Sequence, residues 1–104
     1  MSGRIAILHN EVAADAPEDV RDVLVQVDAV RAALRRSDID PAVIAVNLDL
    51  AQLADRLGEM AADLVINLVE SLAGSGRLAH LVPALLGHLE LPFTGADASA
   101  MLRT

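Results

Sequence analysis

The sequence contains no cysteine and no lysine, and Phe93 is its only aromatic residue. The missing cysteines exclude disulfide bonds, thiolate catalysis and cysteine-type metal sites. Without large rings, the core has to be filled by aliphatic side chains, chiefly Ala, Leu and Val. This composition suits helices packed on an aliphatic sheet and disfavours a β-sandwich or a β-barrel.

Basic residues are also scarce, since 8 Arg stand against 15 Asp and Glu and give a formal net charge of -7. A nucleic-acid-binding surface needs clustered basic side chains, so we expect no nucleic-acid partner. The first apolar run, residues 5–8, is far shorter than the roughly 18 residues of a membrane-spanning helix. We therefore expect a soluble, cytoplasmic protein without a membrane partner.

Short apolar segments alternate with segments of helical periodicity along the whole chain. The apolar segments are continuous rather than alternating, which is typical of parallel strands covered by helices on both faces. We expect strands at residues 4–8, 42–46, 63–68 and 91–94 and helices at residues 17–36, 50–58 and 77–89. The order predicts one α/β domain over residues 1–104, a three-layer Rossmann-like or flavodoxin-like open parallel sheet of about four strands with helices on both faces.

Helix-start signals precede two of these helices. Asp15 has Glu18 three residues later, and Asp49 has Gln52 three residues later, so we expect both aspartates to be N-caps. The second helix is expected to end at Gly58 or to run on to residue 60. The expected inward stripe of the first helix consists of Val20, Val23, Leu24, Val27, Val30 and Leu34.

The third helix contains a proline, because Pro83 lies within residues 77–89. A proline inside a helix removes one hydrogen bond, so either the regular helix starts near His80 or it is kinked. Its expected inward residues are Leu78, Leu81, Val82, Leu85 and Leu89. Asp97 is a possible cap for a last helical turn.

Polar residues follow the first and third expected strands where each strand ends. His9 and Glu11 come after the first strand, and Asn67, Glu70 and Ser71 after the third. Ligands of open α/β sheets bind outside the carboxyl ends of the strands, and parallel neighbours would bring Glu11 and Glu70 together. We predict a substrate-binding site of Glu11, Glu70, Ser71 and His9. The alternatives are that the two glutamates are solvated loop acids, and that Asn67 and Ser71 satisfy backbone groups of the turn, the favoured role for Asn67.

Gly74, Ser75 and Gly76 precede the third helix and form a possible anion-binding loop through their backbone N–H groups. The loop lacks the lysine and the spacing of a Walker A motif, so an ordinary turn with a helix cap is the favoured alternative. His9, His80 and His88 share no metal-ligand spacing, and we predict no metal site.

Three motifs carry a resemblance to a known family: RIAILHNE at residues 4–11, DLVINLVESLAGSGR at residues 63–77 and LVPALLGHLELPFTGADASA at residues 81–100. Together they resemble the N-terminal, pre-ATP-grasp domain of D-alanine:D-alanine ligase and of D-alanine:D-alanine ligase-like ATP-grasp proteins. The resemblance implies a domain that presents an amino-acid substrate in peptidoglycan (cell wall) synthesis, with Glu11 orienting the substrate amino group. Glu70 stands where the better-known ligases have a histidine–glycine pair, so this chain looks closer to the ligase-like branch.

In that family the ATP-binding residues belong to ATP-grasp domains that follow this one and that residues 1–104 do not include. The resemblance therefore implies ATP and Mg²⁺ only for those further domains, no cofactor in this chain, and no catalysis by the chain alone. Two carboxylates and a loop predict millimolar or weaker binding of an amino acid. The alternative is a stand-alone dimerisation or interaction module that keeps the fold without the chemistry. We expect either a homodimer or association with ATP-grasp domains.

Overall fold

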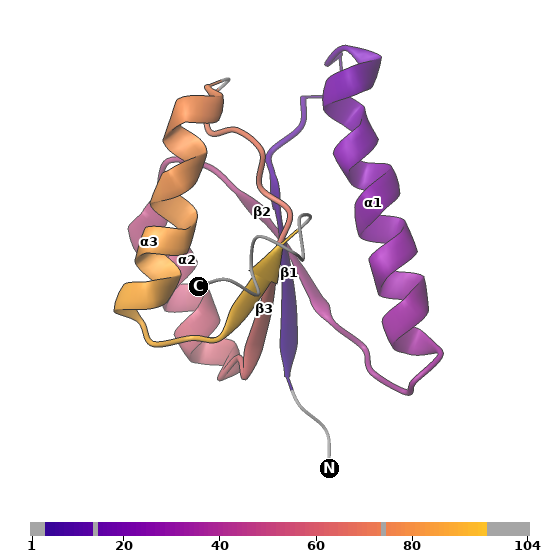
Figure 1. The fold of residues 1–104 in the computed structure, drawn as a ribbon, viewed down its shortest axis with the longest axis vertical. Coiled ribbons are helices and arrows are strands. Elements are labelled where there is room, and N and C mark those ends of the chain that lie inside the picture. The colour runs from indigo at the N-terminus through magenta and orange to yellow at the C-terminus, as the bar shows by residue number, and fades with distance from the viewer. Residues whose placement is uncertain (1–3, 14, 74, 96–104) are drawn as a thin grey trace.

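The computed structural model describes residues 4–13, 15–73 and 75–95. In chain order its elements are β1 (Ile5–Asn10), α1 (Glu18–Arg35), β2 (Ala42–Val46), α2 (Leu50–Met60), β3 (Leu64–Asn67), the 3-10 helix η1 (Gly76–His80), α3 (Leu81–His88) and β4 (Phe93–Gly95). The four strands form one all-parallel sheet in the order β2-β1-β3-β4. Helix α1 covers one face, and α2 and α3 lie side by side on the other (Figure 1). The predicted α/β architecture is confirmed.

Strand β1 lies in the middle of the sheet, and all six of its residues are buried. It pairs with β2 on one side and with β3 on the other, so the expected contact between the first and third strands is confirmed. Ile7 lies opposite Ile66 on β3 in this register. A strand with a neighbour on each side and a helix on each face has no solvent-facing side, which accounts for its continuous apolar run.

The sheet divides the core into two parts. On the α1 face, Val23 and Val27 pack with Ile7 of β1 and Leu68. On the opposite face, the buried residues of α2 and α3 pack with alternate residues of the strands. The helix residues are Leu53, Leu57, Val82 and Leu86, and the strand residues include Leu8 and Val65. Alternation along β1 sends successive side chains to opposite faces, so one short strand contributes to both parts.

One of the two predicted helix caps is present. The side chain of Asp49 accepts a hydrogen bond from the backbone N–H of Gln52 at 3.0 Å. The prediction for Asp15 was wrong, because Pro17 occupies the N-cap of α1 and no side chain bonds the first turn. Helix α2 continues past Gly58 to Met60, and Ala61 ends it in the left-handed conformation.

The predicted inward stripe of α1 is mostly, but not entirely, inward. Val23 and Val27 are buried, and Val30 and Leu34 pack against them. Leu24 is 37% exposed. At 100° per residue, Leu24 lies about 90° from the centre of the buried line, so it falls on the flank of the helix. The side chain of Val20 lies outside the described part of the chain.

Pro83 lies in the first turn of α3, because the regular helix starts at Leu81 after the five residues of η1. The first of the two alternatives is thus correct: N–H groups of a first turn have no partner within the helix, so the proline removes no hydrogen bond there. Leu86, which is fully buried, was missed as an inward residue. Strand β4 begins at Phe93 rather than at residue 91. Asp97 lies outside the described residues.

Within the described ranges, no helix combines the length and the apolar composition that crossing a membrane requires.

Candidate functional site

The ends of three parallel strands meet at the carboxyl edge of the sheet. β1 ends at Asn10, β2 ends at Val46 opposite Asn10, and β3 ends at Asn67 opposite Leu8. The loop after β1 leads to α1 on one face of the sheet, while the loops after β2 and β3 lead to helices on the other face. The chain therefore reverses direction across the sheet between β1 and β3, which is where open α/β sheets form a binding crevice.

Asparagine side chains shape this edge. Asn47 Oδ1 accepts a hydrogen bond from the backbone N–H of Asp49 at 2.8 Å, and Asn67 Oδ1 accepts one from Val69 at 3.1 Å. Both bonds reach two residues ahead, which is the geometry of an Asx turn. The predicted role of Asn67 in satisfying the backbone of its turn is thus confirmed. Asn10, buried at the end of β1, joins two loops because its Oδ1 accepts from the Glu70 N–H at 3.2 Å.

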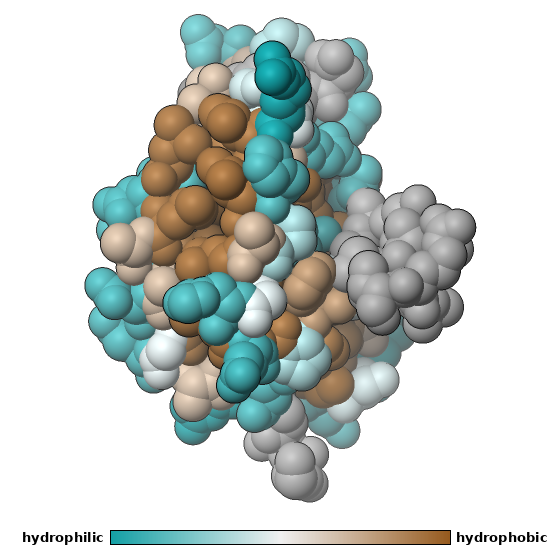
Figure 2. Space-filling model, turned by 60° about the vertical axis from the view of Figure 1, so that its left-hand side comes forward, coloured by the Kyte–Doolittle hydropathy of each residue, from teal (hydrophilic) through white to brown (hydrophobic). Residues whose placement is uncertain are grey.

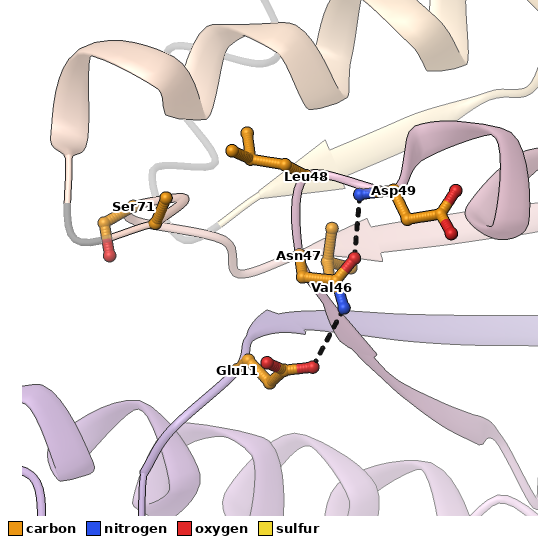
Figure 3. A pocket seen from close by; sticks show the side chains of 7 residues that line it. Glu11, Val46, Asn47, Leu48, Asp49 and Ser71 are labelled. Atoms are coloured by element: carbon orange, nitrogen blue, oxygen red, sulfur yellow. Dashed lines mark hydrogen bonds between the residues drawn. The ribbon is translucent and has the colours of Figure 1, made fainter.

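An open cleft of about 430 Å³ lies at this edge. Its walls come from the loops that follow β1, β2 and β3, and are formed by Glu11, Val46, Asn47, Leu48, Asp49, Ser71 and Ala73. Figure 3 shows Ser71 at the left, Glu11 below and the segment from Val46 to Asp49 running from the centre to the right. Glu11 and Ser71, two of the four predicted substrate-binding residues, therefore line one cleft.

The carboxylate of Glu11 is held in place by Asn47. The Asn47 Nδ2 donates to Glu11 Oε2 at 3.0 Å, and the backbone N–H of Glu11 donates to the Val46 carbonyl at 3.0 Å. A backbone N–H can only donate, so the bond from Asp49 fixes the amide with Oδ1 toward Asp49 and Nδ2 toward Glu11. Among the described residues Glu11 Oε1 has no hydrogen-bond donor, and this oxygen remains available to a ligand.

The second carboxylate in the walls of the cleft has another partner. Asp49 Oδ1 caps α2 through the Gln52 N–H, and Figure 3 shows the Asp49 carboxylate pointing toward α2 and away from Glu11. A capping carboxylate is stabilised by the partial positive charge of the helix N-terminus. Glu11 is therefore the carboxylate of this cleft that can face a ligand.

Apolar and hydroxyl groups complete the cleft. Leu48, whose side chain is 51% exposed, extends toward the segment that carries Ser71 (Figure 3). Ser71 is half-buried, and the adjacent Leu72 is fully buried and anchors the loop in the core. The cleft thus offers one carboxylate acceptor, one hydroxyl group and one apolar wall.

The other two predicted substrate-binding residues lie elsewhere at the same edge. Glu70 is exposed and is not among the residues that line the cleft, although its backbone is joined to Asn10. His9 is buried, and its Nδ1 lies 2.9 Å from the carbonyl oxygen of Asn10. Because a carbonyl only accepts, Nδ1 carries the proton in this bond, which orients the ring near the carboxyl end of β1.

The predicted anion-binding loop uses part of its backbone internally. Ser75 and Leu72 exchange two hydrogen bonds, with the Ser75 N–H donating at 2.9 Å and the Leu72 N–H donating at 3.0 Å. The N–H of Ser75 is therefore committed to the loop. Gly76 starts η1, where an added Cβ would lie 3.6 Å from the Glu70 carbonyl oxygen. Gly74 lies outside the described residues.

Asn47 and Leu48 were not predicted as site residues, and Asp49 was predicted only as a cap. Asn47 follows β2 directly, in the same position that Glu11 occupies after β1. A search of the polar residues after every strand, not only after the first and third, would have found it.

In the described part of the chain, no group of three or more His, Asp or Glu side chains is placed to hold a metal ion.

Comparisons of this chain with protein-family models, with curated proteins and with solved structures find no match.

Proposed function

We propose that the cleft binds the amino group of a small amino-acid ligand, with Glu11 as the acceptor of its ammonium hydrogens. The observation that carries the proposal is the Asn47–Glu11 hydrogen bond of 3.0 Å, which fixes one carboxylate oxygen of a residue that lines the cleft and leaves the other without a donor among the described residues. An ammonium group carries three donors and one positive charge, so it complements a held carboxylate. The Ser71 hydroxyl and the exposed Leu48 side chain would contact the rest of a small ligand.

The three motifs extend this proposal to a biological role. Their resemblance to the N-terminal domain of D-alanine:D-alanine ligase-like proteins suggests that this domain presents an amino-acid substrate to ATP-grasp domains. In this role it would act in the cytoplasm and in peptidoglycan synthesis, and Glu70 and His9 would support the site from the neighbouring strand ends. The resemblance gives Glu11 the same role that the cleft geometry favours.

The resemblance implies ATP and Mg²⁺ only for the further ATP-grasp domains, and we propose no site for either in residues 1–104. The sequence has no lysine to bind a phosphate, and the described residues include no cluster of acids that could hold a metal ion. In this proposal any ATP-dependent step belongs to those other domains, and residues 1–104 contribute binding and orientation of the amino acid.

The isolated domain should bind such a ligand weakly. An exposed ion pair contributes about 1 kcal/mol or less, whereas even millimolar affinity needs about 4 kcal/mol. An open cleft leaves much of the ligand surface in water. The ligand is thus expected to bind firmly only when further domains close over the cleft.

Nuclear magnetic resonance titration tests where the ligand binds. D-alanine is added to the ¹⁵N-labelled domain up to about 10 mM, roughly ten times the expected dissociation constant of about 1 mM. It should shift the amide signals of Glu11, Leu48 and Ser71. The amide of Arg35, at the far end of α1, serves as the internal control and should stay unchanged. Shifts spread evenly over the domain, or absent at the cleft, would contradict the proposal.

A second candidate function is that of an interaction module without a ligand. It is favoured by the half-buried leucines of η1 and α3, and Figure 2 shows apolar surface, interrupted by hydrophilic residues, on this side of the molecule. Monomeric proteins seldom expose large contiguous apolar patches. On this reading the partner is either a second copy of the chain or a set of ATP-grasp domains.

A further inference from the structure

Both charged side chains that line the cleft are acids. Glu11 keeps one carboxylate oxygen without a donor among the described residues, and Asp49 lines the cleft while its carboxylate caps α2. A free amino acid carries its carboxylate on the same carbon atom as its ammonium group. An amino acid that places its ammonium group against Glu11 therefore also brings a negative charge close to these acids. Like charges at short separation repel, so the α-carboxylate weakens binding in the cleft.

The donors of the cleft suit a neutral acceptor. The Asn47 Nδ2 carries two hydrogens, and one of them is used in the bond to Glu11 Oε2. The Ser71 hydroxyl is a second uncharged donor in the walls of the cleft. Such donors can satisfy the carbonyl oxygen of a peptide group, which brings no further negative charge to the acids.

The cleft is also large for a single small amino acid. Its volume of about 430 Å³ lies within the roughly 300 to 1,000 Å³ of pockets that hold drug-sized ligands. Alanine, whose side chain is one methyl group, would fill only a part of this space. Leu48 is 51% exposed and extends toward the segment that carries Ser71 (Figure 3), so it offers an apolar contact to a second residue of the ligand.

We propose that the cleft binds the N-terminal residue of a short peptide, such as a dipeptide, in preference to a free amino acid. The inference rests on the proposed recognition of an ammonium group by Glu11. In a peptide, the first carbonyl group belongs to a neutral amide and can accept from Asn47 or Ser71. The terminal carboxylate lies at least one residue farther along the chain, about 3.5 Å when extended. It would extend out of the cleft, where water and salt screen its repulsion by the acids.

Titration of the ¹⁵N-labelled domain with three ligands separates the effect of charge from that of size. D-alaninamide has nearly the shape of D-alanine but no carboxylate, and D-alanylglycine is a dipeptide with the same first residue. At about pH 6, below the pKa of about 7.7 to 8.0 of an α-amino group, all three ligands carry an ammonium group. The shifts of the Glu11, Leu48 and Ser71 amide signals give the three dissociation constants.

D-alaninamide and D-alanylglycine should each bind about two- to fivefold more tightly than D-alanine, the size of one exposed charge interaction. Raising the salt concentration from about 0.01 M to about 1 M shortens the Debye length from about 30 Å to about 3 Å. The preference for D-alaninamide should therefore narrow at high salt, because this preference arises from charge.

Two substitutions test whether the acids of the cleft cause the preference. Asp49→Asn removes one charge from the walls of the cleft and keeps a side chain that can cap α2. The preference for D-alaninamide over D-alanine should narrow in this variant. Asp55→Asn is the matched control, since it removes the same charge from an exposed position of α2 that does not line the cleft, and should leave the preference unchanged.

Two results would overturn the proposal. The first is D-alanine binding at least as tightly as D-alanylglycine, and the second is a preference for D-alaninamide that Asp55→Asn narrows as much as Asp49→Asn. Either result would leave the proposed function standing, because D-alanine would still bind in the cleft. If none of the three ligands shifts the signals of the cleft, the proposed function and this inference both fail.

Discussion

At the scale of single residues, the candidate site depends on one amide. Asn47 uses its oxygen to turn the chain after β2 and its nitrogen to hold Glu11. The two bonds use different atoms of the amide and form at the same time. Asn47 therefore fixes the turn after β2 and the Glu11 carboxylate together. A freely rotating glutamate would lose side-chain entropy on binding, and a glutamate already held by Asn47 loses less.

Replacing Asn47 by Ala should separate these two roles. Asn47→Ala removes the turn bond and frees Glu11, so we expect a loss of about 1 kcal/mol in the free energy of unfolding and about threefold weaker binding of D-alanine. Asn67→Ala is the matched control, because Asn67 makes the same kind of turn bond after β3 without touching Glu11. Denaturation and titration of both variants are the measurements. Equal loss of ligand affinity in the two variants would show that Asn47 does not position Glu11.

The residues of the site were partly predictable from the sequence. Glu11 and Ser71 follow strands that read clearly as strands, so their place at the carboxyl edge followed from the fold class. Asn47 also follows a predicted strand, but its contact with Glu11 depends on β2 lying beside β1, and sheet order is a tertiary property. Glu70 illustrates a further limit. The parallel pairing of β1 and β3 places the loop after β3 at the carboxyl edge of the sheet, but it does not fix the direction in which the Glu70 side chain points.

At the scale of elements, the two helix starts show how tertiary structure selects among local signals. Asp15 and Asp49 carry the same spacing to an acid or amide three residues later. Only Asp49 caps its helix, where the Asn47 turn brings its backbone directly into the first turn of α2. Helix α1 begins after Pro17 instead, because proline has a fixed φ that suits a helix start and leaves Asp15 too far away.

Paired substitutions of these aspartates test the difference. Asp49→Ala should lower the free energy of unfolding by about 1 kcal/mol through the loss of the N-cap. Asp15→Ala should be close to neutral, since no side chain caps α1. Urea denaturation with equal slopes for both variants is the measurement. A cost for Asp15→Ala as large as that for Asp49→Ala would mean that α1 starts earlier and is capped after all.

Element type was easier to predict than element limits. The helix around Pro83 was expected either to start late or to bend, and the local chemistry of proline decided in favour of a late start at Leu81. Leu24 followed the helical pattern but lies on the flank of α1, because periodicity identifies a face and does not give its width. The error for Leu24 therefore concerns how wide a face of α1 the sheet covers, and not whether the helix exists.

At the scale of the whole molecule, the strand order accounts for both surfaces of interest. Placing β1 between β2 and β3 brings three loops together around the cleft, and it puts α2 and α3 next to each other on one face. The cleft reaches the start of α2, because Leu48 lines the cleft and lies two residues before the first residue of the helix. The parallel direction of the strands, unlike their order in the sheet, was predictable from the alternation of apolar and amphipathic segments.

The central claim is that Glu11 recognises an ammonium group, and a thermodynamic cycle tests it most directly. The dissociation constants of D-alanine and N-acetyl-D-alanine would be measured by titration for the unmodified domain and for Glu11→Gln, with Glu59→Gln as a control at an exposed site on α2. The unmodified domain and the control should prefer the free amine about two- to fivefold, the size of an exposed ion pair, and Glu11→Gln should have no preference. A preference of the same size in Glu11→Gln would contradict the claim.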